Sequence, residues 1–87
     1  MKRIAIKVPV IESERGWGSK IDDYMVCLDS EAAKAFIIEY NSKNTETKTP
    51  DWYMYADSNI NSIELTGSQF TYLVNNGNTW LSILNKK

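Results

Sequence analysis

The 87-residue chain contains no histidine and only one cysteine, Cys27. Without histidine it lacks the commonest general base and the commonest metal ligand. A Cys–His nucleophile and a structural zinc site are therefore excluded, and no internal disulfide can form. Cys27 lies in the middle of an expected strand, so we interpret it as a buried structural thiol. We expect no catalytic residue, no cofactor and no metal.

Long apolar runs and an excess of one charge are also missing. No stretch approaches the roughly 20 apolar residues of a membrane span, and no early stretch has the apolar core of a signal peptide. Because a single cysteine suits a reducing compartment, we expect a cytoplasmic protein without membrane contact. The formal net charge of −1 argues against a dedicated nucleic-acid binder, whose affinity rests on clustered Lys and Arg.

Apolar residues alternate with polar ones over 3–11, which predicts a half-buried strand. Apolar residues on both faces predict a central strand over 22–28, and the aromatic-rich stretch 51–57 predicts a third strand. The polar segment 12–21, with Gly16 and Gly18 around Trp17, predicts a long hairpin loop. Shorter extended segments are expected over 62–65 and 79–84. Pro9 lacks an N–H, so we expect either that its end of the first strand lies at a sheet edge or that its N–H side faces outward.

Two helices are expected, over 30–41 and 66–77. Asp29 or Ser30 can cap the first, and its apolar stripe is formed by Ala33, Phe36, Ile37 and Tyr40. We expect Phe36 and Ile37 to lie in the core. Thr66 and Gln69 predict a capping box for the second helix, and Gly77 closes it. The order ββαβ(β)αβ predicts one α+β domain, 1–87: a small, mostly antiparallel sheet of four to five strands with two helices on one face.

Aromatic residues mark the candidate binding surface. Trp17 lies in a polar, glycine-flanked segment where a core role is hard to arrange, and Trp and Arg are enriched in binding hot spots. The alternative is that Trp17 folds back over the sheet edge. On an extended strand Tyr53 and Tyr55 share one face. The candidate partner-binding residues are Arg15, Trp17, Lys20, Asp51, Trp52, Tyr53 and Tyr55.

Two other functions remain open from the sequence. Tyr53 and Tyr55 could stack nucleobases beside the basic first strand, which would make the chain an RNA- or single-strand-binding protein. A cluster of carboxylates could instead serve a small enzyme or bind Mg²⁺ if the ends of the first two strands bring them together. Its members would be Glu12, Glu14, Asp22 and Asp23.

The chain is small, rich in Asn, Lys and Ile, and empty of catalytic signatures. In this style of composition it resembles small accessory proteins of bacteriophages. The resemblance implies a protein that binds and inhibits a host enzyme or defence complex. We therefore expect a protein-binding module and not an enzyme, with a larger protein as its partner, nucleic acid disfavoured, and a monomeric or homodimeric state.

Overall fold

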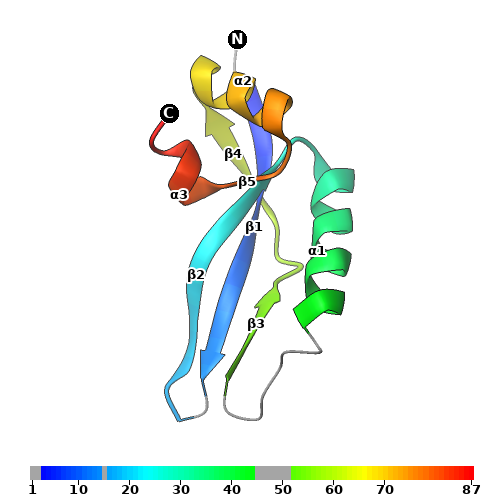
Figure 1. Ribbon diagram of the computed structural model, residues 1–87, viewed down its shortest axis with the longest axis vertical. Coiled ribbons are helices and arrows are strands. Elements are labelled where there is room, and N and C mark those ends of the chain that lie inside the picture. The colour runs from blue at the N-terminus through cyan, green and yellow to red at the C-terminus, as the bar shows by residue number, and fades with distance from the viewer. Residues whose placement is uncertain (1–2, 15, 45–51) are drawn as a thin grey trace.

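The computed structural model describes residues 3–14, 16–44 and 52–87, apart from the side chains of Asn44 and Trp52. Within these residues five strands and three helices follow one another (Figure 1). In order they are β1 (Arg3–Glu14), β2 (Gly18–Cys27), α1 (Ser30–Asn44), β3 (Trp52–Ala56), β4 (Asn61–Leu65), α2 (Gly67–Asn76), β5 (Thr79–Trp80) and α3 (Leu81–Leu84). The α+β class, the antiparallel sheet and the predicted element order are confirmed, with α3 as an addition.

The long strand β1 is paired along both of its edges. On one side it pairs with β2, and on the other it pairs first with β4, through residues 3–7, and then with β3, through residues 10–14. Pro9 lies in the gap between these two partners. Its carbonyl accepts the Asp57 N–H at 2.9 Å, so its missing N–H falls on the side where the ladder is interrupted. Of the two expectations for Pro9, the sheet edge is wrong, because β1 is central, whereas the side of its missing N–H does lie where no ladder partner needs it, between β3 and β4.

The β1–β2 hairpin is longer than the sequence predicts. Its pairing continues through Glu12↔Lys20 to Glu14↔Gly18, with an irregularity in register between Val10 and Ile11. The predicted loop over 12–21 is wrong, because backbone hydrogen bonds hold polar residues in a strand as well as apolar ones. Gly16 and Gly18 have φ of 84° and 85°, which glycine adopts without a steric penalty in the tight turn.

Two hydrophobic clusters lie on opposite faces of the hairpin. Ala5 of β1 and Val26 of β2 face α2 and α3, while Val8 and Met25 face α1. Adjacent strand residues point to opposite faces, so one sheet is covered from both sides, each half by different helices (Figure 1). The predicted placement of the helices on one face is thus corrected. The first cluster is Ala5, Val26, Leu65, Leu73 and Leu84; the second is Val8, Met25, Cys27, Ala33 and Ala56.

Helix α1 begins as predicted and runs one turn further. The Asp29 carboxylate accepts the Ala32 N–H at 2.8 Å and caps the helix. Ala33 is fully buried, whereas Phe36 and Ile37, predicted to be core, are half-buried and pack against the second cluster. At the other end of the helix the side chain of Asn41 contacts the edge of β3. Its Oδ1 accepts the Ala56 N–H at 2.8 Å and its Nδ2 donates to the Ala56 carbonyl at 3.1 Å.

In the second half of the chain the predicted helix cap is confirmed, and the predicted last strand is corrected. Thr66 Oγ1 accepts the Gln69 N–H at 3.2 Å, and Gln69 Oε1 accepts the Thr66 N–H at 3.0 Å, so the capping box is present. Gly77, at φ 80°, donates its N–H to the Leu73 carbonyl. The strand predicted over 79–84 is only two residues long. The chain then turns into α3, where Gln69 Nε2 donates to the Leu84 carbonyl at 3.2 Å.

The double hydrogen bond of Asn41 generates a stability prediction. Asn41→Ala leaves both polar groups of the buried Ala56 backbone without their protein partner, and we expect it to lower the free energy of unfolding by about 1–3 kcal/mol. Urea melts followed by circular dichroism measure this loss. Lys34→Ala, on an exposed part of the same helix, is the control and should stay within about 0.5 kcal/mol of the original chain. Equal stabilities for the two variants would show that water satisfies the Ala56 groups.

Candidate functional site

The end of the β1–β2 hairpin presents an aromatic side chain to solvent. Trp17 is 87% exposed, and its N–H donates to the Glu14 carbonyl at 3.1 Å, which closes the turn. The strands are paired up to Glu14 and Gly18 on either side of this turn. A paired end of two strands therefore carries the most exposed large apolar side chain among those described.

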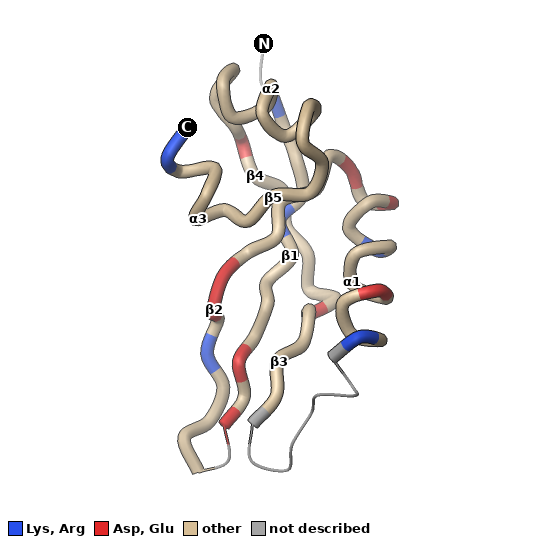
Figure 2. Tube along the Cα trace, viewed as in Figure 1, with Lys and Arg blue, Asp and Glu red and all other residues tan. Residues whose placement is uncertain are grey.

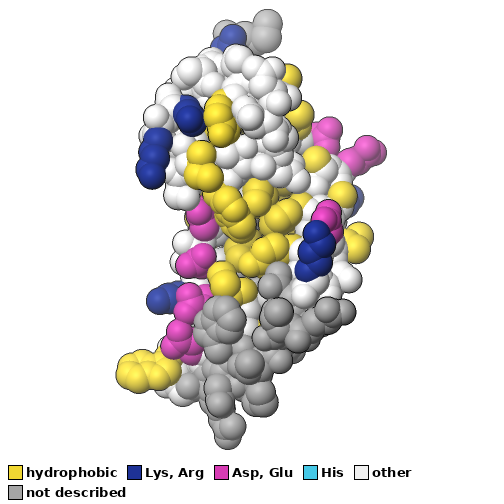
Figure 3. All heavy atoms as spheres, in the orientation of Figure 1, with side chains coloured by type: hydrophobic (Ala, Val, Ile, Leu, Met, Phe, Trp, Pro, Cys, Tyr) yellow, Lys and Arg dark blue, Asp and Glu magenta, His cyan; other side chains and the backbone are white. Residues whose placement is uncertain are grey.

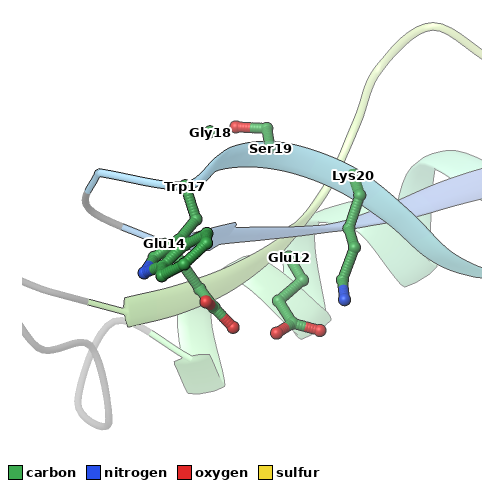
Figure 4. A pocket seen from close by; sticks show the side chains of 6 residues that line it. All are labelled: Glu12, Glu14, Trp17, Gly18, Ser19 and Lys20. Carbon is green, nitrogen blue, oxygen red and sulfur yellow. The ribbon is translucent and has the colours of Figure 1, made fainter.

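A shallow pocket of about 220 Å³ lies beside Trp17. Figure 4 shows the side chains of Glu12, Glu14, Trp17 and Lys20 pointing to one side of the hairpin, and Ser19 pointing to the other. Glu12 and Lys20 are direct cross-strand partners, which places their opposite charges side by side. The pocket thus combines an aromatic wall with charges of both signs. Its lining residues are Glu12, Glu14, Trp17, Gly18, Ser19 and Lys20.

The two glutamates of this pocket interact directly. A side-chain hydrogen bond with Glu12 raises the pKa of Glu14 above its ordinary value, and partial desolvation and the charge of Glu12 act in the same direction. The charge of Lys20 opposes the shift. The two carboxylates are therefore close enough for Glu12 to disfavour the charged form of Glu14. A cationic group from outside would relieve the same repulsion.

The opposite face of the hairpin end carries a second group of aromatic residues. Tyr53 and Tyr55 are stacked, with ring centroids 5.7 Å apart and an interplanar angle of 29°. Tyr55 pairs with Ile11, and Ile11 pairs with Ile21 on the next strand. Directly paired residues lie on the same side of a sheet, so these side chains form one strip across three strands. Ile21 is 51% exposed.

The structure assigns the predicted partner-binding residues to two groups. Trp17 and Lys20 lie together at the pocket, while Tyr53 and Tyr55 lie on the other face of the same end of the sheet. Arg15, Asp51 and the side chain of Trp52 lie outside the described residues. The sequence did not assign Glu12 and Glu14 to the partner surface, nor Ile11 and Ile21 to the tyrosine face. Only the cross-strand register brings them there.

The residues of the two alternative sites lie apart from one another in the described part of the chain. Arg3 and Lys7 pair with β4 at the far end of β1 from the stacked tyrosines, and Lys7 lies over the ring of Tyr24 at 4.7 Å. Figure 2 shows that the basic residues of β1 lie toward one end of the strand and its acidic residues toward the other end, near the turn. Asp23 accepts hydrogen bonds from the Tyr24 N–H and the Ser82 hydroxyl, both at 2.7 Å. Among the described residues no three Asp, Glu, Cys or His side chains could hold a metal ion together.

An aromatic cluster beside α1 was not anticipated from the sequence. Phe36 lies 5.3 Å from Tyr40 and 6.3 Å from Trp80, and the Tyr40 and Trp80 rings are 6.5 Å apart. A second shallow pocket, of about 180 Å³, lies at its rim, lined also by the ion pair of Glu39 and Lys43. Figure 3 shows hydrophobic side chains gathered at the centre of this face, with acidic groups along one side of it. Trp80 joins residues about 40 positions earlier, so no local pattern could reveal the cluster.

Comparisons with protein families, with curated proteins and with solved structures gave no match for this chain. No helix in the described part of the chain is both long and apolar enough to cross a membrane. The assignment of function therefore rests on the geometry of the hairpin end.

Cys27 behaves as the structural thiol that the sequence predicts. It is fully buried in the second cluster, and burial, followed by the nearby charge of Asp29, raises its pKa to about 11. At pH 8 roughly one thiol in a thousand is then ionised, and the thiolate is the reactive form. We expect no reaction with Ellman's reagent in the folded protein at pH 8 and complete reaction in 6 M guanidinium chloride. Rapid labelling of the folded protein would show that Cys27 is accessible.

Proposed function

We propose that this chain is a cytoplasmic protein-binding module that engages a larger protein through the end of the β1–β2 hairpin. The observation that carries the proposal is the exposure of Trp17, 87%, on a turn that the paired strands fix in place. Moving a large aromatic side chain out of water and against a partner is favourable, because it buries apolar surface. Tryptophan is for this reason among the residues most enriched in binding hot spots.

The surroundings of Trp17 suit contact with a protein. Glu12, Glu14 and Lys20 place polar groups of both signs around the ring, and a polar rim around an aromatic anchor is typical of protein interfaces. Because pairing up to Glu14 already orders the strands, binding here requires little further ordering of the backbone. The repulsion between Glu12 and Glu14 favours a partner that brings a Lys or Arg side chain into the pocket.

The tyrosine face allows a partner to contact both sides of the hairpin end. Tyr53 and Tyr55 belong to the edge strand β3, beside Ser13 and Ile11 of β1. The proposed contact set remains Arg15, Trp17, Lys20, Asp51, Trp52, Tyr53 and Tyr55. A projecting hairpin of this kind could enter a cleft of a larger protein and block it. Inhibition of a bacteriophage host's enzyme or defence complex is the role that the compositional resemblance favours.

Trp17→Ala tests the proposal with separate measurements of stability and binding. We expect the melting temperature to change by only a few degrees, because substitutions of exposed residues usually cost within about 0.5 kcal/mol. The affinity for the partner, recovered by affinity capture from the native host and identified by mass spectrometry, should fall by at least about 2 kcal/mol in calorimetry. Ile38→Ala is the control, since Ile38 is 72% exposed on α1 and should leave both values unchanged.

Two results with Trp17→Ala would contradict the proposed role of Trp17. A loss of several kcal/mol in stability, with unchanged partner binding by the folded fraction, would mean that Trp17 covers the sheet edge. Unchanged stability together with unchanged binding would place the contact surface elsewhere.

Binding to single-stranded nucleic acid tests the main alternative. The stacked tyrosines lie far along β1 from Arg3 and Lys7, so the basic end of β1 does not support them, and the affinity should be weak and steeply dependent on salt. Fluorescence anisotropy with labelled RNA and DNA oligomers at about 150 mM salt measures it, with Tyr53→Ala as the matched variant. Submicromolar binding that Tyr53→Ala abolishes would favour a nucleic-acid-binding function over the proposed one.

A further inference from the structure

The sheet edge that β3 and β4 share is closed at β3 and open at β4. Both strands pair with the side of β1 that faces away from β2, each at a different end of it (Figure 1). At β3 the Asn41 side chain binds the outward N–H and C=O of Ala56. At β4 no other described residue hydrogen-bonds to the outward backbone groups. An open edge of this kind is a template for pairing with another strand.

The outward backbone groups of β4 belong to Ser62 and Glu64. The Pro9 carbonyl accepts an N–H from the segment that follows β3, so it faces away from β2. Because backbone groups alternate along a strand, Ala5 also faces away from β2 and forms a hydrogen-bonded pair with Ile63 of β4. The residues on either side of Ile63 therefore point their N–H and C=O groups to the open edge. Both of them are exposed.

One register lets two copies of β4 satisfy each other. An antiparallel pair centred on Ser62 leaves the groups of Glu64 without a partner from β4, and a pair centred on Glu64 places two carboxylates opposite each other. A pair centred on Ile63 places Ser62 of each copy opposite Glu64 of the other. All the outward N–H and C=O groups are then used, and each carboxylate lies opposite a hydroxyl that can donate to it. The overlap covers the whole strand, residues 61–65, whose pairing with β1 has no register shift.

Ile63 adds apolar surface at the centre of the same register. Its side chain is half-buried and packs against the first hydrophobic cluster. Two Ile63 residues that face each other at the centre form a non-hydrogen-bonded pair, in which the side chains come closest. A second copy therefore supplies both the backbone groups and the apolar contact that this edge lacks.

We propose that two copies of this chain associate through the outer edges of β4, antiparallel and centred on Ile63, into one continuous sheet. The occupant of the open edge is thus a second copy. The seam lies at the opposite end of β1 from the turn that carries Trp17, so the association is independent of what Trp17 contacts. The strand is short, and a charge such as that of Glu64 on an edge normally discourages pairing. The dimer is accordingly weak and depends on protein concentration.

A charge added at Ser62 tests the register. Sedimentation velocity of the full chain should show the average mass rising toward that of a dimer as the concentration increases. Ser62→Lys places a cation opposite Glu64 at both ends of the seam, and we expect the association to become about threefold tighter or more. Adding Glu64→Lys to this variant places like charges opposite each other and should remove the gain. Ala35→Lys changes the net charge as Ser62→Lys does, at an exposed position of α1, and should leave association unchanged.

Removal of an outward N–H tests the edge itself. Proline is tolerated on an edge strand where its N–H side faces solvent, so Ser62→Pro removes a hydrogen bond of the seam without breaking the pairing with β1. We expect at least about a tenfold weaker association. Circular dichroism first establishes that each variant is folded. If Ser62→Pro does not fold, Glu64→Pro, which removes the other outward N–H, takes its place, and the lysine variants test the register without it.

Several results would overturn the proposal. The chain could remain monomeric up to about 1 mM, where even a very weak dimer would be populated, and a second copy would then be excluded as the occupant of the edge. A dimer could be unaffected by the folded proline variant, which would place its interface elsewhere. Ser62→Lys could change association no more than Ala35→Lys does, which would exclude the Ile63-centred register.

Discussion

The alternation of side chains along the β1–β2 hairpin is the constraint on which the rest of the structure depends. Ala5 and Val26 point to one face and Val8 and Met25 to the other, so neither face can be left in water over its whole length. Helices α2 and α3 cover one face of the hairpin around Ala5 and Val26, and α1 covers the other face around Val8 and Met25. The hairpin extends past both covers, which leaves its far end as the exposed part of the sheet.

Local signals in the sequence were sufficient wherever a structure is stabilised by residues close in the chain. Thr66 and Gln69 are three residues apart and form the predicted capping box, and the Asp29 cap and the stripe of α1 are equally local. The hairpin end was missed because Glu12, Ser13 and Glu14 carry no apolar alternation. Their extended conformation comes from backbone pairing with residues 18–20, which a hydrophobicity pattern does not record.

The site was predictable only in part, for the same reason. Trp17 stands out locally, since polar and glycine residues surround it, and its exposure agrees with that reading. The pocket beside it and the strip of Tyr55, Ile11 and Ile21 depend on cross-strand register, and one irregularity at Val10 and Ile11 changes that register. The faces on which the helices pack depend likewise on long-range contacts, such as those of Leu73 and Leu84 with Val26.

Residue-resolved amide hydrogen exchange tests most directly whether the hairpin end is a preformed binding platform. Glu12 and Lys20 face each other as a hydrogen-bonded pair. In dilute protein the protection factors of their amides should be within about tenfold of those of core amides such as that of Val8. A well-paired strand end opens locally almost as rarely as the core does. Ile21 follows Lys20, so its amide points away from β1, and it should exchange rapidly in the same sample. Rapid exchange at Glu12 and Lys20 would contradict a rigid hairpin end, and with it the account of how Trp17 is presented to a partner.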